Sequence, residues 1–215
     1  MIRSARTIIL LLFMLGSLLA SGQSYIGVFG GLNRSKLSGD SPAKAKYKNK
    51  LGANIGANID IKLSNIIWLS IQPSYSQEGT RLSYSLRGNL EPVDSVHIRL
   101  NYFSAPLLLK ISSTNGRFYA LGGIEAGYLL SHAVSSHGND LDADLNIADW
   151  NFTIHFGAGI YIPIGFPRLF IELRYSQGLT DLTDESQEIS YIPRIKTSGF
   201  KLLAGIEIPL KRNDK

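Results

Sequence analysis

The chain contains no cysteine, and this absence excludes several structures and chemistries at once. Disulfide bonds, thiolate metal sites, a cysteine nucleophile and a lipid-anchored cysteine are all ruled out. Charge is also sparse, since charged residues make up 18% of the 215 residues and the formal net charge is only +5. A positive charge this weak and dispersed does not favour nucleic acid as a partner. We therefore expect neither a thiol site nor binding to nucleic acid.

Long apolar runs are absent after the first residues of the chain. Two arginines precede the apolar run Ile8–Leu19, which is followed by three small residues at 20–22. This order is typical of a secretory signal peptide, and the run is short for a spanning helix, which needs about 20 residues. We expect residues 1–22 to be a signal peptide, with a retained membrane anchor as the alternative, and residues 23–215 to form one barrel domain. Without a later helical span, a membrane location requires a β-barrel.

Alternation of apolar with small or polar residues dominates the rest of the chain. From Phe152 to Ile162 every second residue is apolar, while the residues between them are threonine, histidine, glycine or tyrosine. A strand directs successive side chains to opposite faces, so this segment has one apolar and one polar face. These eleven residues, tilted by about 45°, would rise roughly 26 Å, close to the apolar band of a transmembrane barrel.

Seven further segments have the same two-residue period. They are residues 24–33, 51–61, 67–75, 96–110, 118–128, 169–175 and 200–208. Short turns near residues 63–65, 112–116 and 165–167 alternate with long connections over 34–50, 77–95 and 131–149 and before residue 200. In the fourth segment we place Ile98, Leu100 and Tyr102 on the apolar face, and we expect a bulge near Pro106 because the alternation breaks there.

This rhythm predicts an all-β fold, an eight-stranded antiparallel transmembrane β-barrel. The strands would form an up-and-down meander with four long outer loops and three short periplasmic turns, in the cell outer membrane. The alternative is a soluble lipocalin-like carrier with an apolar interior and a polar outer face. The polar face is built largely from glycine, asparagine, serine and threonine, and aromatic residues gather near the loop-side ends of the apolar face. Both features favour the membrane barrel.

Several short motifs connect the chain to a known family. The first strand opens with Tyr25–Gly31, the fourth segment contains Pro106–Lys110, and Phe118–Gly123 is followed by Gly127–Leu130. With these motifs the chain resembles the PorT-like outer-membrane β-barrel family of Bacteroidetes-type bacteria. The resemblance implies an outer-membrane barrel, and the family includes members linked to protein secretion and surface assembly. We expect outer-membrane lipid, lipopolysaccharide and envelope or secretion proteins as partners, a monomeric state and no cofactor.

Charged residues on the polar face are expected inside the barrel, where they must pair because eight strands leave room only for side chains. The predicted interior network consists of Arg99, Glu125, His155, Glu172, Arg174, Lys201 and Glu207. A filled lumen favours a non-catalytic structural or interaction protein. The competing hypothesis is a membrane-embedded lipid-modifying enzyme, in which a serine and an acid would converge on a histidine at the lipid–water rim.

Two of the long connections carry charge patterns. Asp140, Asp142 and Asp144 alternate like the start of a calcium loop, but Leu145 and Asn151 occupy the positions where an EF-hand needs glycine and glutamate. They remain a candidate metal site beside the simpler interpretation of a solvated acidic loop. The first connection holds an alternating row that could bind lipopolysaccharide phosphates or pair with acidic loops. Its members are Lys44, Lys46, Lys48 and Lys50.

Overall fold

The computed structural model describes residues 24–39, 45–84, 94–136, 139–141, 147–181 and 195–210. Within these ranges there is no helix long and apolar enough to cross a membrane. The strands are β1 (Ser24–Gly39), β2 (Ala45–Lys62), β3 (Ile67–Ile71), β4 (Ser74–Tyr84), β5 (Asp94–Ser112), β6 (Phe118–Ser136), β7 (Asn139–Leu141), β8 (Trp150–Pro163), β9 (Arg168–Gly178) and β10 (Ile195–Pro209).

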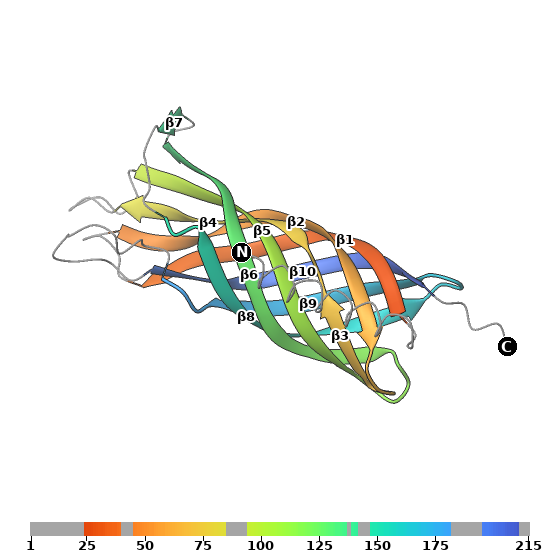
Figure 1. Cartoon of the computed structure of the whole chain (residues 1–215). Helices are drawn as coiled ribbons and strands as arrows, with labels where there is room; N and C mark the ends of the chain where they lie inside the picture. The colour runs from red at the N-terminus through yellow and green to blue at the C-terminus, as the bar shows by residue number, and fades with distance from the viewer. Residues whose placement is uncertain are drawn as a thin grey trace, which may run out of the picture.

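Eight antiparallel strands close into a ring (Figure 1). β3 and β4 form one strand of the barrel, interrupted at Gln72 and Pro73, because both pair with β2 on one side and β5 on the other. The short β7 pairs with the end of β6 and projects from the ring. β1 and β10 complete the ring, with a register that runs from Tyr25 opposite Pro209 to Gly39 opposite Ile195. The predicted eight-stranded barrel is confirmed.

Short turns close one end of the barrel, and long hairpins extend from the other (Figure 1). The turns at residues 63–66, 113–117 and 164–167 match the three predicted ones. β5 and β6 are each 19 residues long in total, although about 9–11 tilted residues suffice to cross a membrane. Much of the predicted long connections is therefore strand, because backbone pairing continues beyond the apolar alternation from which the strands were predicted.

The outside of the barrel is apolar over its middle. Val28, Ile55 and Ile124 are 61%, 64% and 59% exposed. Their chain neighbours Phe29 and Glu125 point inward and are almost fully buried. An apolar outer face all around the barrel is stable in contact with lipid and would be unfavourable in water. The chain is therefore not a soluble carrier with a polar outer face.

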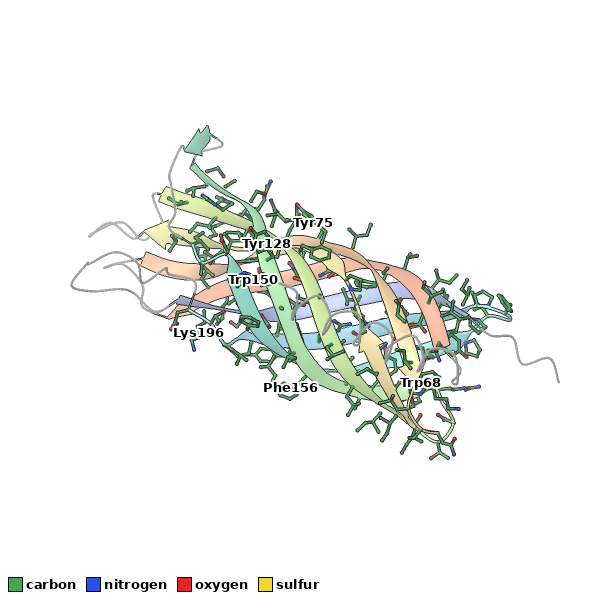
Figure 2. All side chains as sticks on the ribbon, in the orientation of Figure 1. Trp68, Tyr75, Tyr128, Trp150, Phe156 and Lys196 are labelled. Carbon is green, nitrogen blue, oxygen red and sulfur yellow. The ribbon has the colours of Figure 1, made fainter. Side chains whose placement is uncertain are left out.

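An aromatic girdle marks one border of this apolar band. Its members, on six neighbouring strands, are Tyr75, Phe103, Tyr128, Trp150, Tyr175 and Phe200. Strand register places the first four directly opposite one another in turn, and Tyr75, Tyr128 and Trp150 lie close to one level in Figure 2. The rings of Tyr175 and Phe200 continue the girdle with centroids 5.2 Å apart. Such girdles sit at the interface between lipid and water.

Beyond the girdle, toward the long hairpins, the polarity of the wall inverts. Leu37, Leu100 and Tyr102 form a buried apolar cluster inside the barrel, whereas Arg81 and Arg99 are exposed outside it. The predicted outward orientation of Leu100 and Tyr102 is therefore wrong, and so is the inward orientation of Arg99. This part of the wall meets water, so its apolar residues occupy the inner positions, as in a soluble barrel.

The predicted bulge at Pro106 is also absent from β5. The register against β6 is continuous there, and the irregularity falls between Asn101 and Tyr102, where Leu130 is left without a partner position. Pro106 lies opposite Gln72, at the interruption between β3 and β4. Because proline has no N–H to donate, the barrel accommodates it by interrupting the neighbouring strand, and the Pro106 carbonyl still accepts Gln72 N–H at 3.1 Å.

An arginine on the lipid-facing wall tests this orientation. Ile171 and Leu202 are 42% and 52% exposed within the apolar band. Ile171→Arg or Leu202→Arg should lower the free energy of unfolding by about 2–4 kcal/mol and impair insertion, because a charge is placed in hydrocarbon. Leu63→Arg, in a short turn, is the control and should change little. Urea unfolding in lipid vesicles and heat-modifiable gel migration measure the effect; unchanged stability of both wall variants would contradict the assigned faces.

Candidate functional site

Asp60 on β2 is the centre of a buried cluster in the barrel interior, here called the Asp60 cluster. Its carboxylate accepts hydrogen bonds from Ser70 Oγ at 2.5 Å and Lys110 Nζ at 2.9 Å. Tyr161 Oη donates to the same carboxylate at 3.1 Å, and Arg168 Nη2 lies 3.6 Å from it. Since Asp60 and Lys110 are fully buried, these contacts offset the high cost of removing both charges from water.

Two further carboxylates extend the Asp60 cluster across β9 and β10. Arg168 Nε donates to Glu207 Oε2 at 2.7 Å. Glu172 accepts a hydrogen bond from Tyr119 Oη at 2.8 Å and another from Arg174 Nε. Arg168 and Glu207 lie on neighbouring strands, and Tyr119 and Glu172 are separated by one strand. The bond from Tyr161 on β8 to Asp60 on β2 joins opposite sides of the ring.

A second cluster, the His155 cluster, lies nearer the long hairpins. Glu125 Oε2 is 3.1 Å from His155 Nε2, and Ser176 Oγ is 3.0 Å from His155 Nδ1. Lys201 Nζ lies 3.3 Å from Glu125 and 3.4 Å from Glu78. Both ring nitrogens of the fully buried His155 thus have a partner, which is the usual requirement for a buried imidazole.

The charges of the two clusters almost cancel. Four cations face five carboxylates, with His155 beside them. The cations are Lys110, Arg168, Arg174 and Lys201, and the carboxylates are those of Asp60, Glu78, Glu125, Glu172 and Glu207. Near-neutrality and mutual pairing are the conditions under which charges persist in an interior of low dielectric.

The structure brings together six of the seven residues predicted for the interior network. They are Glu125, His155, Glu172, Arg174, Lys201 and Glu207. Arg99 is exposed on the outer face of β5, so its predicted place in the network is wrong. The same misassigned face concealed Lys110, which points inward in phase with Leu108. The place of Asp60 in the network could have been predicted from its position on the polar face of its strand. The identity of its partners could not, because it depends on the strand register.

Ser176, His155 and Glu125 have the connectivity of a hydrolase triad. Their location differs from the one that the enzyme hypothesis requires, because they lie inside the barrel rather than at the lipid–water rim. The space that Ser176 lines there measures about 10 Å³, which is roughly enough for a single water molecule. Glu125 also pairs with Lys201. The arrangement satisfies a buried histidine and leaves no room for a lipid substrate beside Ser176.

The predicted lysine row is only partly described. Lys48 is exposed, whereas Lys50 is half-buried and its Nζ donates to the Ile98 carbonyl at 3.0 Å. A register shift on β2 between Asn49 and Asn54 separates the environments of these two lysines. Lys44 lies outside the described residues, and Lys46 is described only as part of β2.

The candidate calcium ligands lie mostly beyond the described residues. Asp140 belongs to β7, and Asp142 and Asp144 fall in the undescribed stretch that follows. Among the residues that the structure does describe, no group of three histidine or carboxylate side chains could hold a metal ion. The metal site stays a prediction.

A ring of strands with an apolar exterior, an aromatic girdle and a paired, charged interior defines a transmembrane β-barrel of the outer-membrane type. The family model described as "Outer membrane protein beta-barrel domain" matches residues 20–184 of the chain. The chain belongs to this family and is a protein of the cell outer membrane.

Several solved structures of outer-membrane proteins are similar to the chain but share little sequence with it. Ail, the attachment invasion locus protein of Yersinia pestis, is 19% identical over 87% of this chain and 99% of its own, with a TM-score of 0.44. Neisserial surface protein A is 11% identical over 85% and 96%, with a TM-score of 0.47. OprG from Pseudomonas aeruginosa is 10% identical over 89% and 97%, with a TM-score of 0.45. No curated protein matches the chain.

Removal of one partner from the Asp60 cluster should destabilise the barrel more than removal of two. Asp60→Asn leaves Lys110 and Arg168 without a full counter-charge, so we expect a loss of about 3–5 kcal/mol in the free energy of unfolding. Combining Asp60→Asn with Lys110→Met should recover part of that loss, since it removes an unpaired cation. Urea unfolding in lipid vesicles provides all values of this double-mutant cycle. Additive losses would show that the two residues are not coupled.

Ser176 should not behave as a nucleophile. We expect an alkyl fluorophosphonate probe to leave the folded protein unlabelled, because the space beside Ser176 is too small for the probe. A soluble serine hydrolase added to the same detergent sample serves as the positive control for labelling. Labelling of the wild type that disappears in Ser176→Ala would support the lipid-modifying enzyme instead.

Proposed function

We propose that the protein is a non-catalytic outer-membrane barrel that acts as a structural or interaction protein through its long-hairpin end. The observation that carries the proposal is the interior, where two clusters of paired charges occupy the lumen. A barrel filled in this way has its outer surface and its loops available for partners. The same packing argues against a lipid-modifying enzyme, since His155, which has a serine and an acid at hydrogen-bonding distance, is fully buried.

Exposed cations at the long-hairpin end supply the surface chemistry for such contacts. They lie on the four neighbouring barrel strands β1, β2, β4 and β5, at the level of the aromatic girdle (Arg34) or beyond it, and are here called the basic rim. Its members are Arg34, Lys36, Lys48, Arg81 and Arg99. Cations at this level attract the phosphates of lipopolysaccharide or the carboxylates of an acidic protein.

We further propose that the barrel is a monomer whose protein partner belongs to the secretion or envelope-assembly machinery. The resemblance to the PorT-like family supports this choice, and the basic rim supports an acidic contact surface on the partner. Lys48 of the predicted lysine row is exposed, and it belongs to this rim.

Quantitative co-purification tests the proposal. An epitope tag placed within residues 85–93 allows recovery of the protein from native outer membranes. We expect at least one envelope protein to be enriched about tenfold over an equally tagged, unrelated barrel, and the enrichment to fall in Arg81→Gln/Arg99→Gln, because two rim cations are lost. Heat-modifiable gel migration confirms that this variant folds. Equal recovery with the unrelated barrel would contradict an interaction role.

A further inference from the structure

The aromatic girdle is interrupted by an arginine on β1. Strand register places Tyr175 opposite Phe200, and Phe200 opposite Arg34. The position on β1 that continues the aromatic row therefore carries a guanidinium group. At the border of the apolar band a guanidinium group meets lipid headgroups, and its planar set of donors matches the oxygens of a phosphate.

The wall is hollowed around this arginine. The cavity measures about 450 Å³ and is lined by residues of β1, β2, β9 and β10. Arg34 and Lys36 supply cations on one side, and Gln177 and Ser198 supply uncharged polar groups on the other. Register puts Lys36, Ser198 and Gln177 in one row, and this row is farther from the membrane centre than the Arg34 row. The side of the hollow farther from the membrane centre is therefore polar, and the side nearer to it is aromatic.

Both cations of the hollow are available to an anion. With the Asn49 amide turned so that its oxygen faces Arg34, this oxygen accepts hydrogen bonds from Arg34 Nη2 at 2.9 Å and from Arg34 Nε at 3.2 Å. These two bonds hold the guanidinium group in place. Within the described part of the chain neither Arg34 nor Lys36 pairs with a carboxylate. Two cations without counter-ions, next to neutral hydrogen-bonding groups, favour a phosphate.

An apolar groove lies on the same strands, nearer the membrane centre. It measures about 830 Å³, and it forms where Gly30 and Ala204 stand opposite each other on β1 and β10. The larger side chains of Ile55 and Ile171 flank this pair. Gly30 precedes Arg34 by four residues, which is about 13 Å along the strand and about 9 Å of depth at a 45° tilt. Both hollows thus fall within one leaflet, which is roughly 15 Å thick.

We infer that β9, β10, β1 and β2 form a site for one phosphorylated lipid of the outer leaflet. Its phosphate binds between Arg34 and Lys36, and an acyl chain lies over Phe200 and enters the groove at Gly30 and Ala204. A free anion would make no use of the groove, and a water-soluble protein would not reach below the girdle. The inference deepens the lipopolysaccharide part of the proposed function and rests on it.

Native mass spectrometry of the full-length protein in detergent tests this site. The probes are dioleoyl phosphatidic acid, the matched dioleoylglycerol that lacks the phosphate, and inorganic phosphate. We expect one phosphatidic acid to be retained at least tenfold more than dioleoylglycerol. Arg34→Gln/Lys36→Gln should reduce its retention to the dioleoylglycerol level, because the hollow then has no cation. Inorganic phosphate at equal concentration should not displace the lipid, because it lacks the acyl contacts.

Two matched variants separate this site from general attraction. Arg81→Gln/Arg99→Gln removes two rim cations that do not line the hollow. It should lower retention by no more than about twofold, because these cations act on the phosphate only through screened long-range attraction. Gly30→Leu fills the groove and should fold, since a Cβ there meets only the Asn54 carbonyl oxygen at 3.8 Å. It should lower the retention of the dioleoyl lipid several-fold while leaving that of short-chain dihexanoyl phosphatidic acid unchanged.

The outcomes distinguish failure of the site from failure of the proposed function. Equal loss of lipid in Arg81→Gln/Arg99→Gln and in Arg34→Gln/Lys36→Gln would overturn the site and leave a diffuse basic rim. Displacement of the lipid by inorganic phosphate, or unchanged retention in Gly30→Leu, would overturn the acylated ligand. No preference of the wild type for phosphatidic acid over dioleoylglycerol would overturn both the site and the lipopolysaccharide contact from which it follows.

Discussion

Closure of β1 on β10 is the constraint on which the rest of the structure depends. Hydrocarbon offers no partner to backbone N–H and C=O groups, and only a ring of strands satisfies all of them without an open edge. Closing eight strands fixes a narrow interior. The inner face adapts to it with glycine: a Cβ on Gly159 would lie 2.3 Å from Tyr119, and one on Gly205 would lie 2.5 Å from Phe170. Space for large inner side chains therefore comes from glycines at the paired positions of neighbouring strands.

The narrow interior in turn decides how its charges are arranged. Asp60 on β2 collects contacts from Ser70 on β3, Lys110 on β5, Tyr161 on β8 and Arg168 on β9. A slip of one residue in any of these strands would turn the polar side chain toward lipid and leave its partner buried without a counter-charge. The pairing of charges inside the barrel therefore penalises every alternative register of the strands around it.

Alternation predicted the strands and most of their faces, because hydrocarbon outside and a packed interior impose opposite demands on successive residues. It failed on β5, where Leu100 and Tyr102 also alternate with polar residues but lie inside. The period is the same on both sides of the girdle, and only the position relative to the membrane says which face is apolar. Partners in the network were equally hidden, since Lys110 and Asp60 are 50 residues apart and meet only through strand register.

The Ser176–His155–Glu125 arrangement shows why connectivity alone does not define a function. A buried imidazole needs a partner at each nitrogen, and in a polar interior those partners are commonly a carboxylate and a hydroxyl group. The same arrangement of three residues would occur in a hydrolase, but there the serine must also face a space that admits the substrate. Here the lumen is occupied by side chains. The outer wall, by contrast, changes from apolar to basic at the level where Phe200 and Arg34 stand opposite each other. Recognition therefore has room on the wall and at the hairpins, not in the interior that holds the barrel together.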